Sequence, residues 1–173
     1  IAMIPSAVKA GTVYSVLPTP VFGEELVVNG DFATDSDWAK SSQTTISNGS
    51  ANILSTDGSF QQITQSGYSS TQGKTVLVTV NITDVQSGQL KVSFVGGGTN
   101  TNIPNTVGSH TIYVLNDGTI GVFSIGRVGG VTDVSINNVS IKEVLTANAD
   151  FDFTRASTAT RVNSKGLIES VAS

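Results

Sequence analysis

The fold is decided by the stretch Glu24-Glu25-Leu26-Val27-Val28-Asn29-Gly30-Asp31-Phe32, followed shortly by Trp38. In an extended segment, Leu26 and Val28 lie on one face and Val27 lies on the other. The Asn-Gly pair tolerates positive φ, so the chain can bend or reverse directly after this short strand. The stretch therefore predicts a strand, a tight turn and an aromatic anchor, and it opens a β module that we expect over residues 23–145.

Period-two alternation is the main signal inside this module. Over Lys74–Thr83 the residues Val76, Val78, Val80 and Ile82 share one face, as expected of a sheet with one buried face. Gln89–Val95 repeats the pattern. Over Val131–Val144 the alternation changes phase at Asn137-Asn138, which predicts a β-bulge or a strand that switches sheets.

Turn signals separate the strands. Asn48-Gly49 and Asp57-Gly58 each predict a hairpin between β runs, and a further strand is expected over Ser59–Thr64. Helical periodicity is nearly absent from the module. We therefore predict an all-β fold, an antiparallel β-sandwich of the jelly-roll type, with an extended N-terminal arm and a short C-terminal β segment.

Composition excludes several classes of function. The 173 residues carry 13% charged and 38% hydrophobic side chains, with a net charge of -4 and no cysteine. Scattered basic residues argue against nucleic acid, and the lack of cysteine excludes disulfides and thiolate metal sites. A single histidine, His110, excludes multi-histidine zinc sites. No apolar run approaches the roughly 20 residues that span a bilayer, so no membrane insertion is expected.

The two ends of the chain differ from the module. Residues 1–22 contain two apolar, extended pieces and three of the prolines, and we expect them to form an attachment arm. The arm either packs on the module or lies along another protein. Residues 146–173 predict a strand, a basic-polar loop and a hairpin around Lys165-Gly166, and we expect the natural polypeptide to continue beyond them. The residues of the arm expected to dock onto a partner are Ile4, Pro5, Val13, Tyr14, Val16 and Leu17.

The module resembles the jelly-roll carbohydrate-binding modules attached to many glycan-degrading enzymes. The opening Asn29-Gly30-Asp31-Phe32 with Trp38, and a closing strand over residues 134–142, carry the resemblance. The resemblance implies a candidate structural calcium between the opening and closing strands, with Asn29, Asp31 and Asn138 as the ligands. A polar turn without metal is the alternative, because amides stand at 137 and 138 where those relatives often have an acid.

Aromatic side chains are the candidate sugar platforms, because an aromatic ring suits the face of a pyranose. Trp38 either stacks on sugar or fills the core under the first strand. Tyr68 lies in a Gly/Ser loop, which predicts exposure. Tyr113 and Phe60 are further candidates.

The flanks resemble a group of tailed-bacteriophage structural proteins. Residues 1–18 are similar to the N-terminal leader of that group, and residues 153–169 are similar to the segment that follows the leader there. This implies a virion protein, of the fibre or surface-decorating type, in which a jelly roll is inserted between the two segments. It also implies a homotrimer, located on the virion surface and joined to other virion proteins through the arm.

We expect no enzymatic activity. The carboxylate pairs Asp35/Asp37 and Asp150/Asp152 carry no sign of the burial that glycoside hydrolysis needs, and His110 lacks a nucleophile signature. The sequence thus favours a non-enzymatic virion structural protein whose β-sandwich binds cell-surface or environmental glycan. Two alternatives stay open: the non-catalytic sugar-binding module of a secreted polysaccharide-degrading enzyme, and a purely architectural capsid or tail protein.

Overall fold

The computed structural model describes residues 6–9, 12–15, 20–145, 159–162 and 168–171. The chain divides into two units, Thr19–Thr146 on the one hand, and Ile1–Pro18 with Ala147–Ser173 on the other. In the second unit, β1 (Ser6–Lys9) pairs antiparallel with β2 (Thr12–Ser15), and β14 (Ala159–Val162) pairs antiparallel with β15 (Ile168–Val171). β14 and β15 pair on either side of the turn predicted at Lys165-Gly166, two residues that lie outside the described residues.

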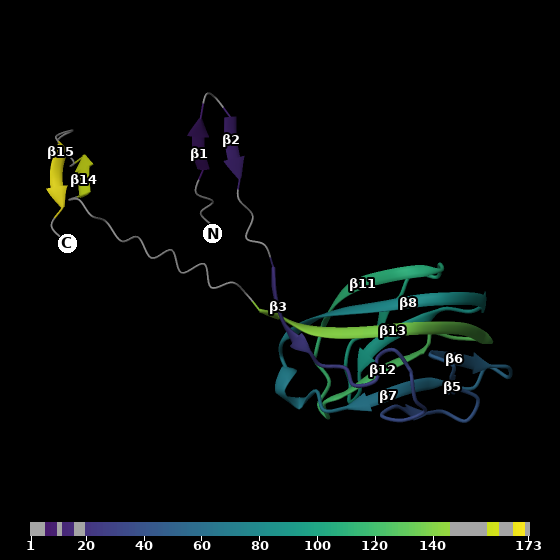
Figure 1. Ribbon diagram of the computed structural model, residues 1–173. Coiled ribbons are helices and arrows are strands. Elements are labelled where there is room, and N and C mark those ends of the chain that lie inside the picture. Colours follow the sequence, from purple (N-terminus) through teal and green to yellow (C-terminus); the bar gives the residue numbers. More distant parts are fainter. Residues whose placement is uncertain (1–5, 10–11, 16–19, 146–158, 163–167, 172–173) are drawn as a thin grey trace. The chain divides into compact units, whose positions relative to one another are not determined.

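The unit Thr19–Thr146 is a sandwich of two antiparallel sheets (Figure 1). One sheet has five strands in the order β10-β9-β12-β7-β4, and the other has six in the order β11-β8-β13-β6-β5, with β3 added against β13. Among the described residues there is no α-helix, only the short 3-10 helix η1 (Ser69–Thr71). The predicted all-β antiparallel sandwich is therefore confirmed. The strands of this unit are β3 (Val21–Glu25), β4 (Ala39–Lys40), β5 (Thr45–Ser47), β6 (Ser50–Ser55), β7 (Gln62–Ser66), β8 (Thr75–Ser87), β9 (Leu90–Phe94), β10 (Thr101–Asn102), β11 (Gly108–Leu115), β12 (Val122–Arg127) and β13 (Thr132–Leu145).

The core lies between the two sheets and follows the predicted alternation. Val76, Val78, Val80 and Ile82 of β8 are all buried, while the residues between them are partly exposed. The five-stranded sheet faces them with side chains such as Ile63, Val92, Phe94, Phe123 and Ile125, all buried. Burial of these apolar side chains, at about 25 cal/mol per Å² removed from water, is the main stabilising term.

Local turn chemistry predicted some connections and not others. Asn48 and Gly49 have φ of 52° and 72° and join β5 to β6 as a hairpin, as predicted. The phase change at Asn137-Asn138 is a bulge, since Asn138 has φ of 52° and the register of β13 against β8 shifts there. The hairpin predicted at Asp57-Gly58 is wrong: β6 belongs to the six-stranded sheet and β7 to the five-stranded one, so the chain crosses between sheets.

The opening stretch pairs with the closing strand. The first strand of the unit is Val21–Glu25, slightly earlier than predicted, so the boundary expected between residues 22 and 23 falls inside β3. Leu26 N donates to Ile141 O (2.9 Å) and Val139 N donates to Gly30 O (2.7 Å). Val21 and Leu145 are direct partners, so the chain enters and leaves the sandwich side by side.

Candidate functional site

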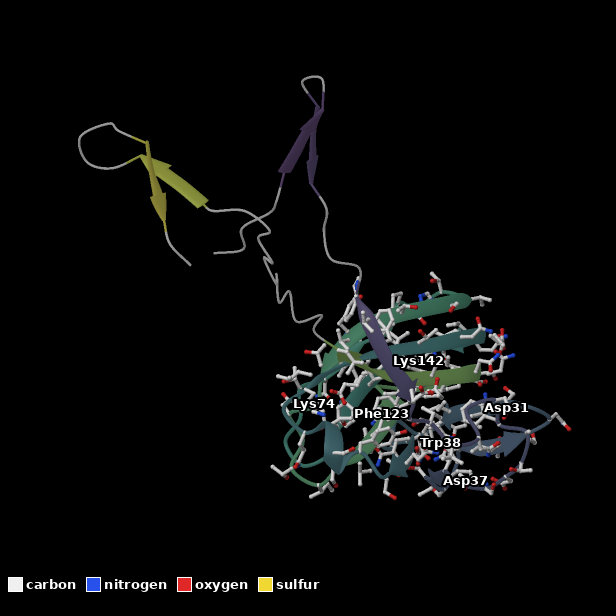
Figure 2. The ribbon with its side chains drawn as sticks, turned by 60° about the vertical axis from the view of Figure 1, so that its left-hand side comes forward. Asp31, Asp37, Trp38, Lys74, Phe123 and Lys142 are labelled. Atoms are coloured by element: carbon white, nitrogen blue, oxygen red, sulfur yellow. The ribbon has the colours of Figure 1, made fainter. Side chains whose placement is uncertain are left out.

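Trp38 is a core residue and cannot serve as a sugar platform. Its side chain is 5% exposed, its ring packs on Phe32 with centroids 5.6 Å apart, and its Nε1 donates to Asn29 O (3.0 Å). Figure 2 shows it beside the loop that carries Asp31 and Asp37. The indole therefore fastens the opening turn to the core, which confirms the alternative that placed it under the first strand.

The expected exposure of Tyr68 is wrong. The residue is 2% exposed, and its ring lies against Phe94 and Phe123 with centroids 5.9 Å away in each case. Its hydroxyl donates to Gln65 Oε1 (2.7 Å). Burial, reinforced by the negative charge of Glu25, raises the pKa of Tyr68 well above its ordinary value. The Gly/Ser loop folds inward because Asn116, itself buried, donates from Nδ2 to Tyr68 O (2.9 Å).

Tyr113 and Phe60 remain exposed, at 56% and 53%. Tyr113 lies on β11, the edge strand of the six-stranded sheet, opposite Leu77 of β8. Phe60 lies in the connection between β6 and β7 rather than in the strand predicted over Ser59–Thr64. The ring of Phe60 lies against the outer face of the five-stranded sheet, as its contact with Gly126 shows.

Phe60 rests on a glycine at the centre of a polar row. A side chain at Gly126 would meet Phe60 Cζ at 3.4 Å and Gln62 Cβ at 3.1 Å, so the ring lies over the bare backbone of β12. Gly126 pairs with Gln62 on one side and with Lys91 on the other, and Lys91 pairs with Asn102. The row Asn102–Lys91–Gly126–Gln62 crosses four strands, so at the usual strand spacing it spans roughly 14 Å.

A second row carries hydroxyl groups. Ser124 pairs with Ser93 and with Thr64, two residues along the strands from the first row and hence on the same face. Ser124 Oγ donates to Gln62 Oε1 (2.6 Å), and this bond orients the Gln62 amide. We call the two rows with Phe60 the Phe60 face: an apolar ring beside amide, hydroxyl and ammonium groups.

The loop that carries Phe60 is held by several hydrogen bonds. Arg127 donates from Nε to Ser59 O (2.5 Å), and also to Gly58 O and Gly130 O. Asp57 Oδ1 accepts from Ser59 N (2.9 Å) and from the side chain of Gln43 (3.0 Å). Hydrogen bonds from the side chain and the backbone of Ser59, and then from Gln43, lower the pKa of Asp57 to about 2. The ring is thus presented on a fixed support, which lowers the entropic cost of binding.

The predicted calcium ligands lie close in the fold, because Gly30 and Val139 are hydrogen-bonded, but their groups do not suit a cation. Thr34 O and Ser36 O both point at Asn29 Nδ2 (2.8 and 2.9 Å), which is a donor where calcium would need oxygen. Asp31 is exposed and its Oδ1 accepts from Ala33 N (3.3 Å). Asn138 is exposed at the bulge. In the described part of the chain no group of three or more His, Asp or Glu side chains could hold a metal, and we assign no calcium site.

Other sequence candidates offer no chemistry of their own. His110 Nε2 lies 2.6 Å from Thr106 O, and Asp35 pairs with Lys40 (2.5 Å). An open hollow of about 460 Å³ next to η1 is lined partly by Asp117, whose pKa is lowered by hydrogen bonds from the Thr99 side chain and backbone. Within the described residues, no helix has the length and apolar character to cross a membrane.

The arm residues are only partly described. Val13 and Tyr14 lie in β2, for which the backbone alone is described, and Ile4, Pro5, Val16 and Leu17 lie outside the described residues. Their predicted docking role stays a prediction.

Comparison with known proteins finds similarity in structure but not in sequence. No protein-family model matches the chain, and no curated protein sequence matches it. The fold is similar to the enzymatically active domain of tailspike protein 4 of bacteriophage CBA120, with 18% identity and a TM-score of 0.47 over 69% of this chain. That match covers only 21% of the tailspike chain. It is also similar to a CBM4 structure, with 18% identity and a TM-score of 0.38, covering 66% of this chain and 83% of the other.

Proposed function

We propose that this chain is a non-enzymatic virion structural protein, of the fibre or surface-decorating type, whose β-sandwich binds glycan through the Phe60 face. The observation that carries the glycan part is the exposed Phe60 ring, held over Gly126 beside the Gln62 amide and the Ser124 hydroxyl. Sugar rings have an apolar face and a rim of hydroxyls, so they match a ring bordered by hydrogen-bonding groups. The resemblance of both flanks to phage structural proteins supports the virion part.

The position of the Phe60 face suits display. Residues Val76 and Glu143 pair near the end where the chain enters and leaves, whereas Ser87 and Asp133 pair at the opposite end of β8. Lys91 follows Ser87 directly through the short turn at Gly88, so the Phe60 face lies toward that opposite end. Val76 and Ser87 are eleven residue steps apart along β8, roughly 35 Å at the usual rise. A module held by its two terminal segments would therefore point this face outward.

The end near the termini carries several exposed apolar side chains suited to contact with a neighbouring subunit. Val21, Phe22, Tyr113, Leu115 and Leu145 are between 38% and 56% exposed there. Clustered apolar exposure of this kind marks an interaction surface. These side chains support contact with a partner at the attachment end, and the resemblance of the flanks to phage structural proteins is what leads us to propose a homotrimer joined there to other virion proteins.

The glycan part is tested by affinity electrophoresis of the full 173-residue chain in gels containing neutral and acidic polysaccharides. We expect retardation by at least one polysaccharide, strongly reduced in Phe60→Ala and retained in Tyr113→Ala. Retardation lost only in Tyr113→Ala would move the site to the six-stranded sheet. No retardation by any polysaccharide would leave the purely architectural alternative.

The virion part is tested by locating the protein in imaged particles. A glycosidase domain encoded after Ser173, with no particle association, would favour the secreted-enzyme alternative.

A further inference from the structure

Charge is divided unevenly between the two sheets. The chain has a net charge of -4, yet the strands of the five-stranded sheet contain no Asp or Glu. Their charged residues are all basic: Lys40, Lys91 and Arg127. The strands of the six-stranded sheet and β3 contain Glu24, Glu25, Asp84, Asp133, Lys142 and Glu143. The strands beneath Phe60 thus carry only basic side chains on an acidic protein, and Asp57, the carboxylate of the loop that carries Phe60, accepts hydrogen bonds from Ser59 and Gln43.

Among the three basic side chains, Lys91 is the one available to a ligand. Lys40 is paired with Asp35, and the guanidinium of Arg127 donates to three backbone carbonyls. Lys91 Nζ lies over the Phe60 ring in a cation–π contact, 5.8 Å from the ring centroid, and no described carboxylate lies within 4.0 Å of it. The ammonium group therefore lies over the ring on which a sugar would stack, and its flexible stem lets it turn from the ring to a carboxylate on that sugar.

A neutral ligand and an acidic ligand have opposite consequences for this group. A neutral sugar laid on Phe60 would strip water from the ammonium group without supplying a counter-charge, which costs free energy. A sugar that carries a carboxylate would pair with it through a charge-assisted hydrogen bond. No acidic side chain of the sheet's own strands competes for Lys91 or repels such a ligand.

We propose that the Phe60 face recognises an acidic glycan, with a uronate carboxylate bound by Lys91 and the apolar face of the same or the adjacent sugar on Phe60. This inference rests on the proposed glycan-binding function and names the chemical class of its ligand. The Gln62 amide and the hydroxyls of the second row are then left for the neutral hydroxyls of the sugar.

The test compares each acidic polysaccharide with a neutral copy of itself. Polygalacturonate, alginate and hyaluronan are used together with their carboxyl-reduced forms, in which the carboxylate becomes a primary alcohol and the backbone is kept. We expect at least one acidic form to bind the full chain about tenfold more tightly than its reduced form, as one charge-assisted bond implies. The preference should weaken as salt is raised.

Variants separate the role of Lys91 from that of net charge. Lys91→Gln should remove the preference and Lys91→Arg should keep it, while Lys142→Gln, which removes the same charge from the other sheet, should leave it unchanged. Equal binding of acidic and reduced forms, or binding confined to neutral polysaccharides, would overturn this inference and leave the proposed function standing. Absence of binding to any polysaccharide would overturn both.

Discussion

Gly30 is the point at which the opening turn touches the closing strand, and replacing it by alanine should destabilise the sandwich strongly. A Cβ at Gly30 would lie 2.2 Å from Val139 O, 3.3 Å from Val139 C and 3.1 Å from Val27 Cγ1. The positive φ of the Asn-Gly pair is at Asn29, with φ of 53°, and not at Gly30. The glycine is therefore required by close backbone approach rather than by its own conformation.

The size of the effect follows from what must move. Reaching an ordinary contact of about 3.4 Å from 2.2 Å requires more than an ångström of separation. Such a shift breaks the hydrogen bond from Val139 N to Gly30 O (2.7 Å). Losing that hydrogen bond costs about 1 kcal/mol and overpacking costs about 1–3 kcal/mol, so we expect the free energy of unfolding to fall by roughly 2–4 kcal/mol. The melting temperature should fall by roughly 10 °C.

The assay is urea unfolding of the full chain, followed by the fluorescence of Trp38. This is the chain's one tryptophan and it is buried in the sandwich, so its signal reports that unit. Gly129→Ala is the matched control, because a Cβ there meets nothing within 4 Å and the residue does not have positive φ. The control should change stability by less than about 0.5 kcal/mol. Equal urea midpoints for the two variants would refute the reasoning.

Three further predictions concern the site and its support. Phe60→Ala should weaken glycan binding about tenfold. Phe60 is 53% exposed, and a sugar that covers roughly 50 Å² of its ring, at about 25 cal/mol per Å², gains about 1.3 kcal/mol of binding free energy. Titration of a polysaccharide that retards the wild type measures this, and an unchanged Kd would contradict it. Gln65 makes four hydrogen bonds, to Val28 N, Val28 O, Asp37 O and the Tyr68 hydroxyl. Gln65→Leu should therefore lower the free energy of unfolding by roughly 3–5 kcal/mol. Tyr68→Phe removes only one of these bonds and should lower it by about 1 kcal/mol. Equal urea midpoints for these two variants would show that the amide is not the centre of this network. For Asp57, a folded-state pKa lowered from 3.8 to about 2 means that its stabilisation is complete above pH 4 and is lost as the pH falls toward 2. The melting temperature of the wild type should therefore fall more than that of Asp57→Asn between pH 4 and pH 2. Parallel plots of melting temperature against pH for the two proteins would contradict this prediction.

The strands of the core could be predicted because burial on one face is a local pattern. Alternation over Val76–Ile82 needs no knowledge of the partner strands, and all four inward residues are buried as expected. The bulge at Asn138 was predictable for the same reason, since a phase change is visible within one strand. The crossing at Asp57-Gly58 was not, because a turn signal does not tell which sheet the next strand joins.

The site itself depends on contacts between distant residues. Phe60 meets Gly126 and Lys91 only because β12 lies between β7 and β9, and that strand order leaves no trace in the local sequence. The burial of Tyr68 likewise depends on the distant Asn116, which holds its loop inward. The sequence shows that the segments forming β10, β9, β12, β7 and β4 contain no acidic residue. It does not show that these segments form one sheet, so the uneven division of charge between the two sheets could not be predicted from it.

The side-by-side entry and exit of the chain determine how the module would respond to tension. A pull applied between the two terminal segments loads the Val21–Leu145 pair first, then Phe22–Val144, then Glu25–Lys142. These contacts are loaded one after another, so β3 peels away at lower force than a strand sheared along its whole length. Under such a pull β3 is therefore the first element to yield, while the Phe60 face at the far end of the sandwich keeps its shape.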